Sequence, residues 1–127
     1  MNVFCIPHRL PGLNELISAL NRGHGKYNPG NILKRDTQEM IRYYAVQAMN
    51  AGTLHRTAEP CEVFITWQEE NKRRDVDNVE SAVKFILDAL IDVVIEGDSP
   101  RYIKQIHHTV TYGDHSKVTV EFREART

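Results

Sequence analysis

Four stretches of the chain carry short apolar runs or alternate apolar and polar residues, and each predicts a β-strand. In the second stretch, Cys61, Val63, Ile65 and Trp67 share one face of the strand. Gly113-Asp114 separates the last two stretches and is typical of a tight turn, so these two stretches predict a β-hairpin. The four stretches are residues 2–6, 61–68, 101–112 and 117–122.

Three other stretches carry apolar residues at the spacing of an amphipathic helix. The second of them begins where Asp36 or Thr37 provides an N-cap and ends at Gly52. The segment 21–35 before it is basic and rich in Gly, Asn and Pro, and it predicts a mobile loop. The three predicted helices are residues 13–20, about 37–51 and about 77–94.

The predicted elements follow one another in the order β-α-α-β-α-β-β. This order predicts an α/β (α+β) fold, in which helices pack on a single mixed β-sheet. With 127 residues, of which 41% are hydrophobic and 26% charged, the chain is typical of one globular domain spanning residues 1–127.

The apolar segments give an expectation about the compartment. None approaches the roughly 20 residues that cross a bilayer, and the N-terminal sequence does not resemble a signal peptide. We therefore expect a cytoplasmic protein without a membrane partner. Cys5 and Cys61 both lie in apolar runs and are interpreted as buried free thiols, with a disulfide between them as the alternative.

The net charge of the chain is -1, so its overall balance does not indicate nucleic-acid binding. Positive charge is instead local, as contacts with a phosphate backbone require. It is concentrated in two segments, residues 22–35 and 72–74. Their basic residues are Arg22, Lys26, Lys34 and Arg35 in the first, and Lys72, Arg73 and Arg74 in the second.

Two aspartates, Asp75 and Asp77, directly follow the second basic segment. A third, Asp98, follows the last predicted helix. If the three converge, they supply the hard oxygen ligands that Mg²⁺ or Mn²⁺ takes. A structural alternative also exists. Asp77 with Glu80 matches a capping box, and Asp75 is equally explained as a surface acid paired with arginine.

Lys84 is a candidate for a catalytic cation. Ser81, Lys84 and Asp88 all fall within about 40° of the helical line through Asp77, so Lys84 could face a metal site and neutralise a phosphate oxygen. An ordinary ion pair between Lys84 and Asp88, one helical turn apart, is the alternative.

Three motifs in residues 72–103, about a quarter of the chain, resemble the RusA-like Holliday junction resolvases. They are Arg74-Asp75-Val76-Asp77-Asn78, Lys84 with Leu87-Asp88-Ala89-Leu90, and Val93-Val94-Ile95-Glu96-Gly97-Asp98-Ser99. The resemblance implies a small homodimeric enzyme of bacterial or phage origin. Such an enzyme is a Mg²⁺-dependent endonuclease that resolves four-way DNA junctions by nicking opposite strands.

By this resemblance, Asp75, Asp77 and Asp98 match the metal-binding acids, and Lys84 is the transition-state cation. Lys84 departs from the family pattern, because the family lysine usually stands one turn earlier, where this chain has Ser81. The shift moves the lysine about 4.5 Å along the helix. Two smaller points concern Gly97, which replaces a frequent family acid, and Pro11-Gly12-Leu13-Asn14, which echoes an early family motif.

The basic residues of both segments would contact DNA phosphates, with Arg74 matching the basic residue that precedes the first acid in the family. Two alternatives stay open: a non-catalytic DNA-binding protein that retains the fold, and a metal-dependent nucleotide phosphohydrolase. A histidine metal site is a third idea, although His107 and His108 point to opposite faces of a strand, with His115 nearby.

Overall fold

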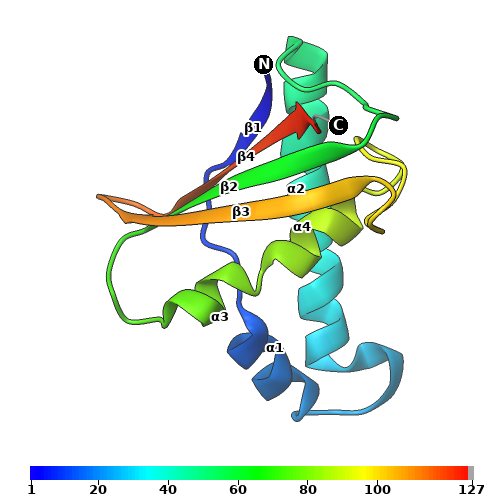
Figure 1. The fold of residues 1–127 in the computed structure, drawn as a ribbon. Helices are drawn as coiled ribbons and strands as arrows, with labels where there is room; N and C mark the ends of the chain where they lie inside the picture. Colours follow the sequence, from blue (N-terminus) through cyan, green and yellow to red (C-terminus); the bar gives the residue numbers. More distant parts are fainter. Residues whose placement is uncertain (126–127) are drawn as a thin grey trace.

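The computed structural model describes residues 1–125, apart from the side chain of Lys26. Its four strands form one mixed sheet in the order β1-β4-β2-β3 (Figure 1). The strands are β1 (Asn2–Ile6), β2 (Cys61–Glu69), β3 (Ile103–Tyr112) and β4 (Lys117–Glu124).

Four α-helices and one short 3₁₀-helix complete the fold. In Figure 1, the helices lie to one side of the sheet, and α1 and α3 lie farther from it than α4. This arrangement confirms the predicted α+β class, in which helices pack on a single mixed sheet. The helices are α1 (Leu13–Leu20), η1 (Gly25–Tyr27), α2 (Pro29–Ala51), α3 (Val76–Glu80) and α4 (Val83–Leu90). Among the described residues, no helix combines the length and apolar character that crossing a membrane requires.

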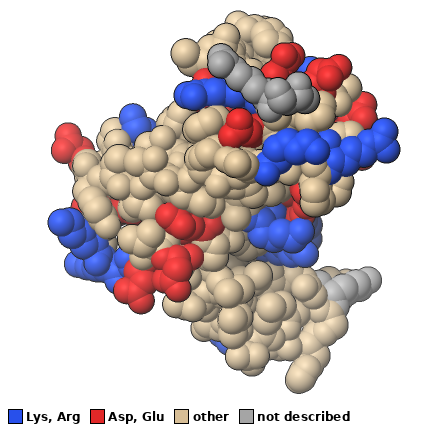
Figure 2. Space-filling model, in the orientation of Figure 1, with Lys and Arg blue, Asp and Glu red and all other residues tan. Residues whose placement is uncertain are grey.

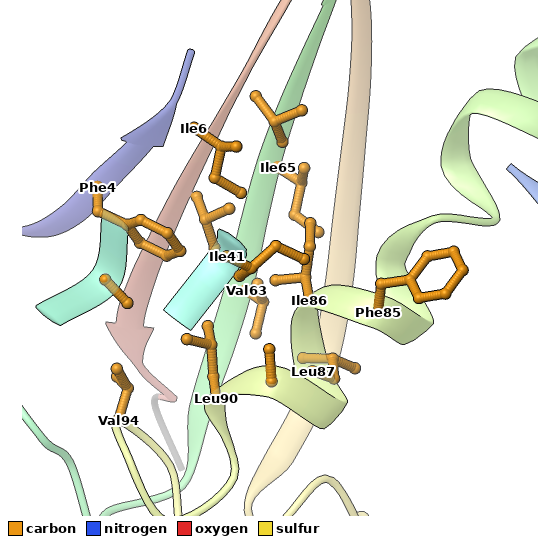
Figure 3. Close-up of a cluster of buried hydrophobic side chains, with 14 of the residues drawn as sticks. Phe4, Ile6, Ile41, Val63, Ile65, Phe85, Ile86, Leu87, Leu90 and Val94 are labelled. Carbon is orange, nitrogen blue, oxygen red and sulfur yellow. The ribbon is translucent and has the colours of Figure 1, made fainter. Parts of the chain in front are cut away.

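The core lies between the inner face of the sheet and helices α2 and α4. Val63 and Ile65 of β2 point into it, as the alternation of the sequence predicts. Ile41 of α2 and Ile86 and Leu90 of α4 meet them from the helical side, so that side chains from distant parts of the chain point toward one another (Figure 3). The removal of this apolar surface from water is the main term that holds the helices on the sheet.

The predicted hairpin of the last two strands is wrong, because β2 lies between β3 and β4. It pairs in parallel with β3 and antiparallel with β4. The turn after β3 crosses the end of β2, where the Gly113 N–H donates to the Glu69 carbonyl at 3.0 Å. A central strand has neighbours on both edges, which suits β2 because its inner side chains are all buried.

Helix α2 begins seven residues before the predicted cap, so much of the predicted mobile loop is helical. The Asn28 side chain is the N-cap, and it accepts a hydrogen bond from the Gly30 N–H at 2.7 Å. Pro29 stands at the first helical position, where its missing N–H costs nothing. The Asn28-Pro29 pair is therefore the sequence signal for the start of α2, and the polar residues around it led to the prediction of a loop.

The long predicted helix of residues 77–94 is in fact two short helices. The Ser81 hydroxyl donates to the Asn78 carbonyl at 2.5 Å, and the Ala82 N–H bonds to the Val79 carbonyl instead. This local bonding breaks the helical ladder between α3 and α4. The second helix ends at Leu90, and Asp92 adopts a left-handed conformation with φ of 68°.

The two cysteines are free thiols, as predicted, but their environments differ. Cys61 is buried, and this burial raises the pKa of its thiol. The expectation for Cys5 is wrong. Because Phe4 and Ile6 point into the core, the alternation of a strand turns Cys5 to the outer face, where it is exposed.

This difference predicts two rates of thiol modification in the folded chain. At neutral pH, a thiol reagent should modify Cys5 rapidly, whereas Cys61 should react only when the chain opens, because the thiolate is the reactive form. Mass spectrometry of modified peptides over time measures both rates, and Cys5→Ser should remove the fast phase. Equal rates for the two thiols in the folded chain would contradict the placement of Cys61.

Candidate functional site

The acidic turn, defined here as residues Asp75–Asn78, follows the central strand of the sheet. Strand β2 ends at Glu69, a loop of residues 70–74 leads away from it, and Asp75 is the N-cap residue of α3. Parallel strands commonly carry ligand sites beyond their carboxyl ends. The turn occupies such a position, because β2 runs parallel to its neighbour β3.

The carboxylates of Asp75 and Asp77 are exposed to solvent and little used by the fold. Asp75 takes the extended backbone of an N-cap, but its side chain caps nothing and has no hydrogen bond or ion pair within the described part of the chain. Asp77 accepts one hydrogen bond, at 2.9 Å, from the neighbouring Asn78 N–H. The predicted capping box is therefore wrong, since Asp77 lies inside the helix and Asp75 stands at the cap.

Arg74 turns into the protein instead of toward Asp75 or solvent. Its guanidinium lies 2.8 Å from the Glu69 carboxylate, and their side chains are 11% and 10% exposed. It also donates to the Leu10 carbonyl at 2.9 Å and lies 3.6 Å from Glu15. The predicted phosphate contact of Arg74 is thus replaced by an internal role, because the largely buried Glu69 carboxylate requires a charged partner.

A hollow of about 260 Å³ lies at the loop that precedes the acidic turn. Arg9, Asn71, Arg73 and Ser116 are among the residues that line it, so that three separate segments of the chain contribute. Arg73 is exposed, and Lys72 lies with its ammonium 5.1 Å from the ring centre of Tyr112. The hollow therefore offers an accessible cation on the loop that leads into the acidic turn.

Acidic and basic side chains occupy neighbouring but separate areas on this side of the molecule. Figure 2 shows Asp and Glu side chains gathered over α3, with Lys and Arg side chains over the loop that precedes it. The lower part of the same view, over α1, carries very little charge. Carboxylates, which a metal ion requires, thus stand next to cations, which a phosphate backbone requires.

The other predicted DNA contacts lie on the α1–α2 end of the molecule. Arg22 follows α1, and Lys34 and Arg35 are exposed on α2 instead of in a mobile loop. Arg35 is paired with the adjacent Asp36 at 3.0 Å. The side chain of Lys26 lies outside the described residues, so its predicted contact stays a prediction.

Asp98 and Lys84 form a second charged group, away from the acidic turn. The Lys84 ammonium lies 3.0 Å from Asp88, as the predicted ion pair requires, and 3.6 Å from Asp98. The two carboxylates, with that of Asp88 acting more strongly, raise the pKa of Lys84. The loop between α4 and β3 therefore folds back over α4 and brings Asp98 to Lys84.

The structure does not bring the three predicted aspartates together. In Figure 1, α3 begins at one end of the α3–α4 pair and the loop of residues 91–102 lies at the other. Across the described residues, no group of three or more His, Cys, Asp or Glu side chains is arranged to hold a metal ion. What remains at the acidic turn is a pair of exposed carboxylates, Asp75 and Asp77.

The histidines lie on opposite faces of β3, as predicted. His107 is bonded to Glu62 at 2.7 Å on the outer face, and the Trp67 indole N–H donates to His108 at 2.9 Å on the inner side. Each ring thus has its own partner. This arrangement gives the histidine metal site no support.

Sequence reasoning missed the contacts that hold the acidic turn. One of them had a signal: β2 alternates, and Glu69 shares the inner parity of Ile65 and Trp67. A buried carboxylate needs a cation as its partner. Arg74, five residues further along the chain, is that cation. The contacts of Asn78 and Ser81 with α1 had no such local signal, since they join residues more than 60 positions apart.

Comparison with known proteins supplies no family. No family model matches the chain, and no curated protein matches it significantly in sequence.

The Arg74–Glu69 pair predicts a measurable loss of stability. Arg74→Met leaves a largely buried carboxylate without its cation, which should lower the free energy of unfolding by on the order of 3 kcal/mol. Denaturant unfolding followed by Trp67 fluorescence measures the change, and Arg73→Met, at the exposed neighbour, should cost less than about 0.5 kcal/mol. Adding Glu69→Leu to Arg74→Met should restore much of the loss; no recovery would argue against the pair as its cause.

Proposed function

We propose that this chain is a Mg²⁺-dependent, structure-selective endonuclease that hydrolyses phosphodiester bonds in four-way DNA junctions, as the RusA-like motifs suggest. The observation that carries the proposal is the state of Asp75. The carboxylate of an N-cap aspartate normally accepts a hydrogen bond from a backbone N–H of the helix. The Asp75 side chain makes no such capping bond and is exposed to solvent.

The residues of the acidic turn fit what Mg²⁺ requires. Mg²⁺ in phosphoryl-transfer sites keeps several waters and is bound by one or two carboxylates together with substrate phosphates. Asp75 and Asp77 would provide the carboxylates, and Mn²⁺ could replace Mg²⁺ with the same ligands. When bound, the ion would polarise a phosphoryl oxygen and lower the pKa of a bound water.

The basic residues near the turn would bind the DNA backbone. Arg73 lines the hollow at the loop before the acidic turn and is exposed, and Lys72 precedes it on the same loop. Contacts of this kind fix the position of the duplex and carry no sequence information. Lys84 of α4 and Asp98 of the loop that follows α4 form a separate pair. Any part they take in the reaction requires the 91–102 loop to move or the pair to contact DNA elsewhere.

A homodimer would suit this substrate, because two copies related by a two-fold axis present two acidic turns to a junction with the same symmetry. The proposal also places the protein in bacterial or phage DNA metabolism, and hence in the cytoplasm.

Two observations favour a second candidate, a DNA-binding protein without nuclease activity. The three aspartates of the motif are divided between two places, and Ser81 stands where the resemblance expects a lysine. Such a protein would retain Arg73 and Lys72 for phosphate binding but would lack a complete set of catalytic groups.

A nicking assay decides between these candidates. The full chain should nick a labelled four-way junction when Mg²⁺ is present and leave a linear duplex of the same arm sequence intact. Asp75→Asn should reduce the rate on the order of 100-fold or more, because it removes a charged ligand of the Mg²⁺ ion that would polarise the reacting phosphate. Its control is Glu59→Gln, which removes one negative charge from an exposed residue before the start of β2.

We expect Glu59→Gln to nick at the rate of the unaltered chain. Junction binding without nicking by the unaltered chain would favour the non-catalytic candidate. Asp75→Asn nicking at full rate would remove Asp75 from the proposal, and phosphate release from free nucleotides without DNA nicking would point to a nucleotide phosphohydrolase.

A further inference from the structure

The start of α1 touches the acidic turn on both sides. Before the turn, Arg74 donates to the Leu10 carbonyl at 2.9 Å and lies 3.6 Å from Glu15. After the turn, the Asn78 side-chain oxygen accepts from the Asn14 N–H at 3.0 Å, and the Ser81 hydroxyl oxygen accepts from the Leu13 N–H at 2.8 Å. The chain between Arg74 and Asn78 is therefore anchored at each end to one short segment.

These contacts exist because α1 has no N-cap side chain of its own. Its N-cap residue is Gly12, and the first N–H groups of a helix have no acceptor within the helix. Asn78 and Ser81 supply those acceptors from another part of the chain. Gly12 allows the close approach, because a Cβ atom there would lie 2.4 Å from the Asn78 carbonyl oxygen.

The Ser81 hydroxyl contacts both α1 and the acidic turn. Its hydroxyl oxygen accepts from Leu13 and its O–H donates to the Asn78 carbonyl, while its own backbone N–H donates to the Asp77 carbonyl at 3.0 Å. Both hydrogen bonds of the Ser81 hydroxyl are thus directed at α1 or at the acidic turn, while its carbonyl accepts from the Lys84 N–H of α4. A serine whose hydroxyl merely faced solvent would show neither of the two hydroxyl contacts.

Resting on the proposed function, we infer that Asn78 and Ser81 are positioning residues that hold the Asp75 and Asp77 carboxylates in one geometry by docking the turn on α1. Two acids that repel each other settle apart unless the backbone fixes them. A ligand pair that is held in place binds a cation with less loss of conformational freedom than a mobile pair. Ser81 in this chain therefore serves the site through structure and not through charge.

The first test measures the turn itself and needs no nuclease activity. Ser81→Ala in the full chain should speed amide hydrogen exchange at residues 75–80 about fivefold or more, because one anchoring hydrogen bond is lost. Ser81→Thr keeps the hydroxyl and should exchange like the unaltered chain. Ser18→Ala, at an exposed serine of α1, is the control and should also leave residues 75–80 unchanged.

Unchanged exchange at residues 75–80 in Ser81→Ala would overturn the inference. Equal acceleration over the whole chain would also overturn it, since that pattern indicates a general loss of stability.

The second test asks whether the anchoring matters to the proposed site. In the nicking assay, Ser81→Ala should raise the Mg²⁺ concentration for half-maximal rate about fivefold, with a nearly unchanged rate at saturating Mg²⁺, and Ser81→Thr should restore the original dependence. Faster exchange with an unaltered Mg²⁺ dependence would show that the anchoring is structural only, against the inference. If the unaltered chain nicks nothing, the proposed function fails, and the exchange experiment still decides whether Ser81 holds the turn.

Discussion

The parallel pairing of β2 and β3 is the constraint on which the geometry of the site depends. In a parallel pair, the carboxyl end of one strand and the amino end of its neighbour lie at opposite ends of the strands. Asp75 follows β2 and Asp98 precedes β3, so the topology separates them by default. The loop after α4 recovers part of this distance by folding back to Lys84, but it stops short of α3. The division of the acidic motif into two groups is thus a consequence of sheet order.

Within that frame, burial and charge determine where the acidic turn sits. Glu69 ends β2 at an inner position and pairs with Arg74, which in turn reaches Leu10 and Glu15 near α1. The arginine that would otherwise balance the acids is therefore withdrawn into the protein. Asp75 and Asp77 are left exposed and form no ion pair within the part of the chain that the structure describes. Their segment is anchored on both sides, and under these conditions a divalent cation stabilises a pair of carboxylates.

The sequence predicted the parts of the structure that local patterns determine. Strand alternation located the four strands, and helical periodicity located α1 and the body of α2. It failed where distant residues decide. The Gly113-Asp114 turn says nothing about β2 entering between its two strands, and no pattern near Ser81 shows that its hydroxyl accepts from the Leu13 N–H, 68 positions away. For the site, the exposure of Asp75 and Asp77 follows from their polar context, whereas the inward turn of Arg74 depends on Glu69 being buried, which single-sequence reasoning overlooked.

The central claim is that Asp75 and Asp77 together bind a divalent cation, and paramagnetic broadening by Mn²⁺ tests it most directly. In amide spectra of the isotope-labelled chain, small additions of Mn²⁺ should broaden the signals of residues 75–78 before all others, and Asp75→Asn should abolish this preference. Excess Mg²⁺ should restore the signals by competition. Broadening that begins at Asp88 and Asp98, or that spares residues 75–78 altogether, would contradict the account.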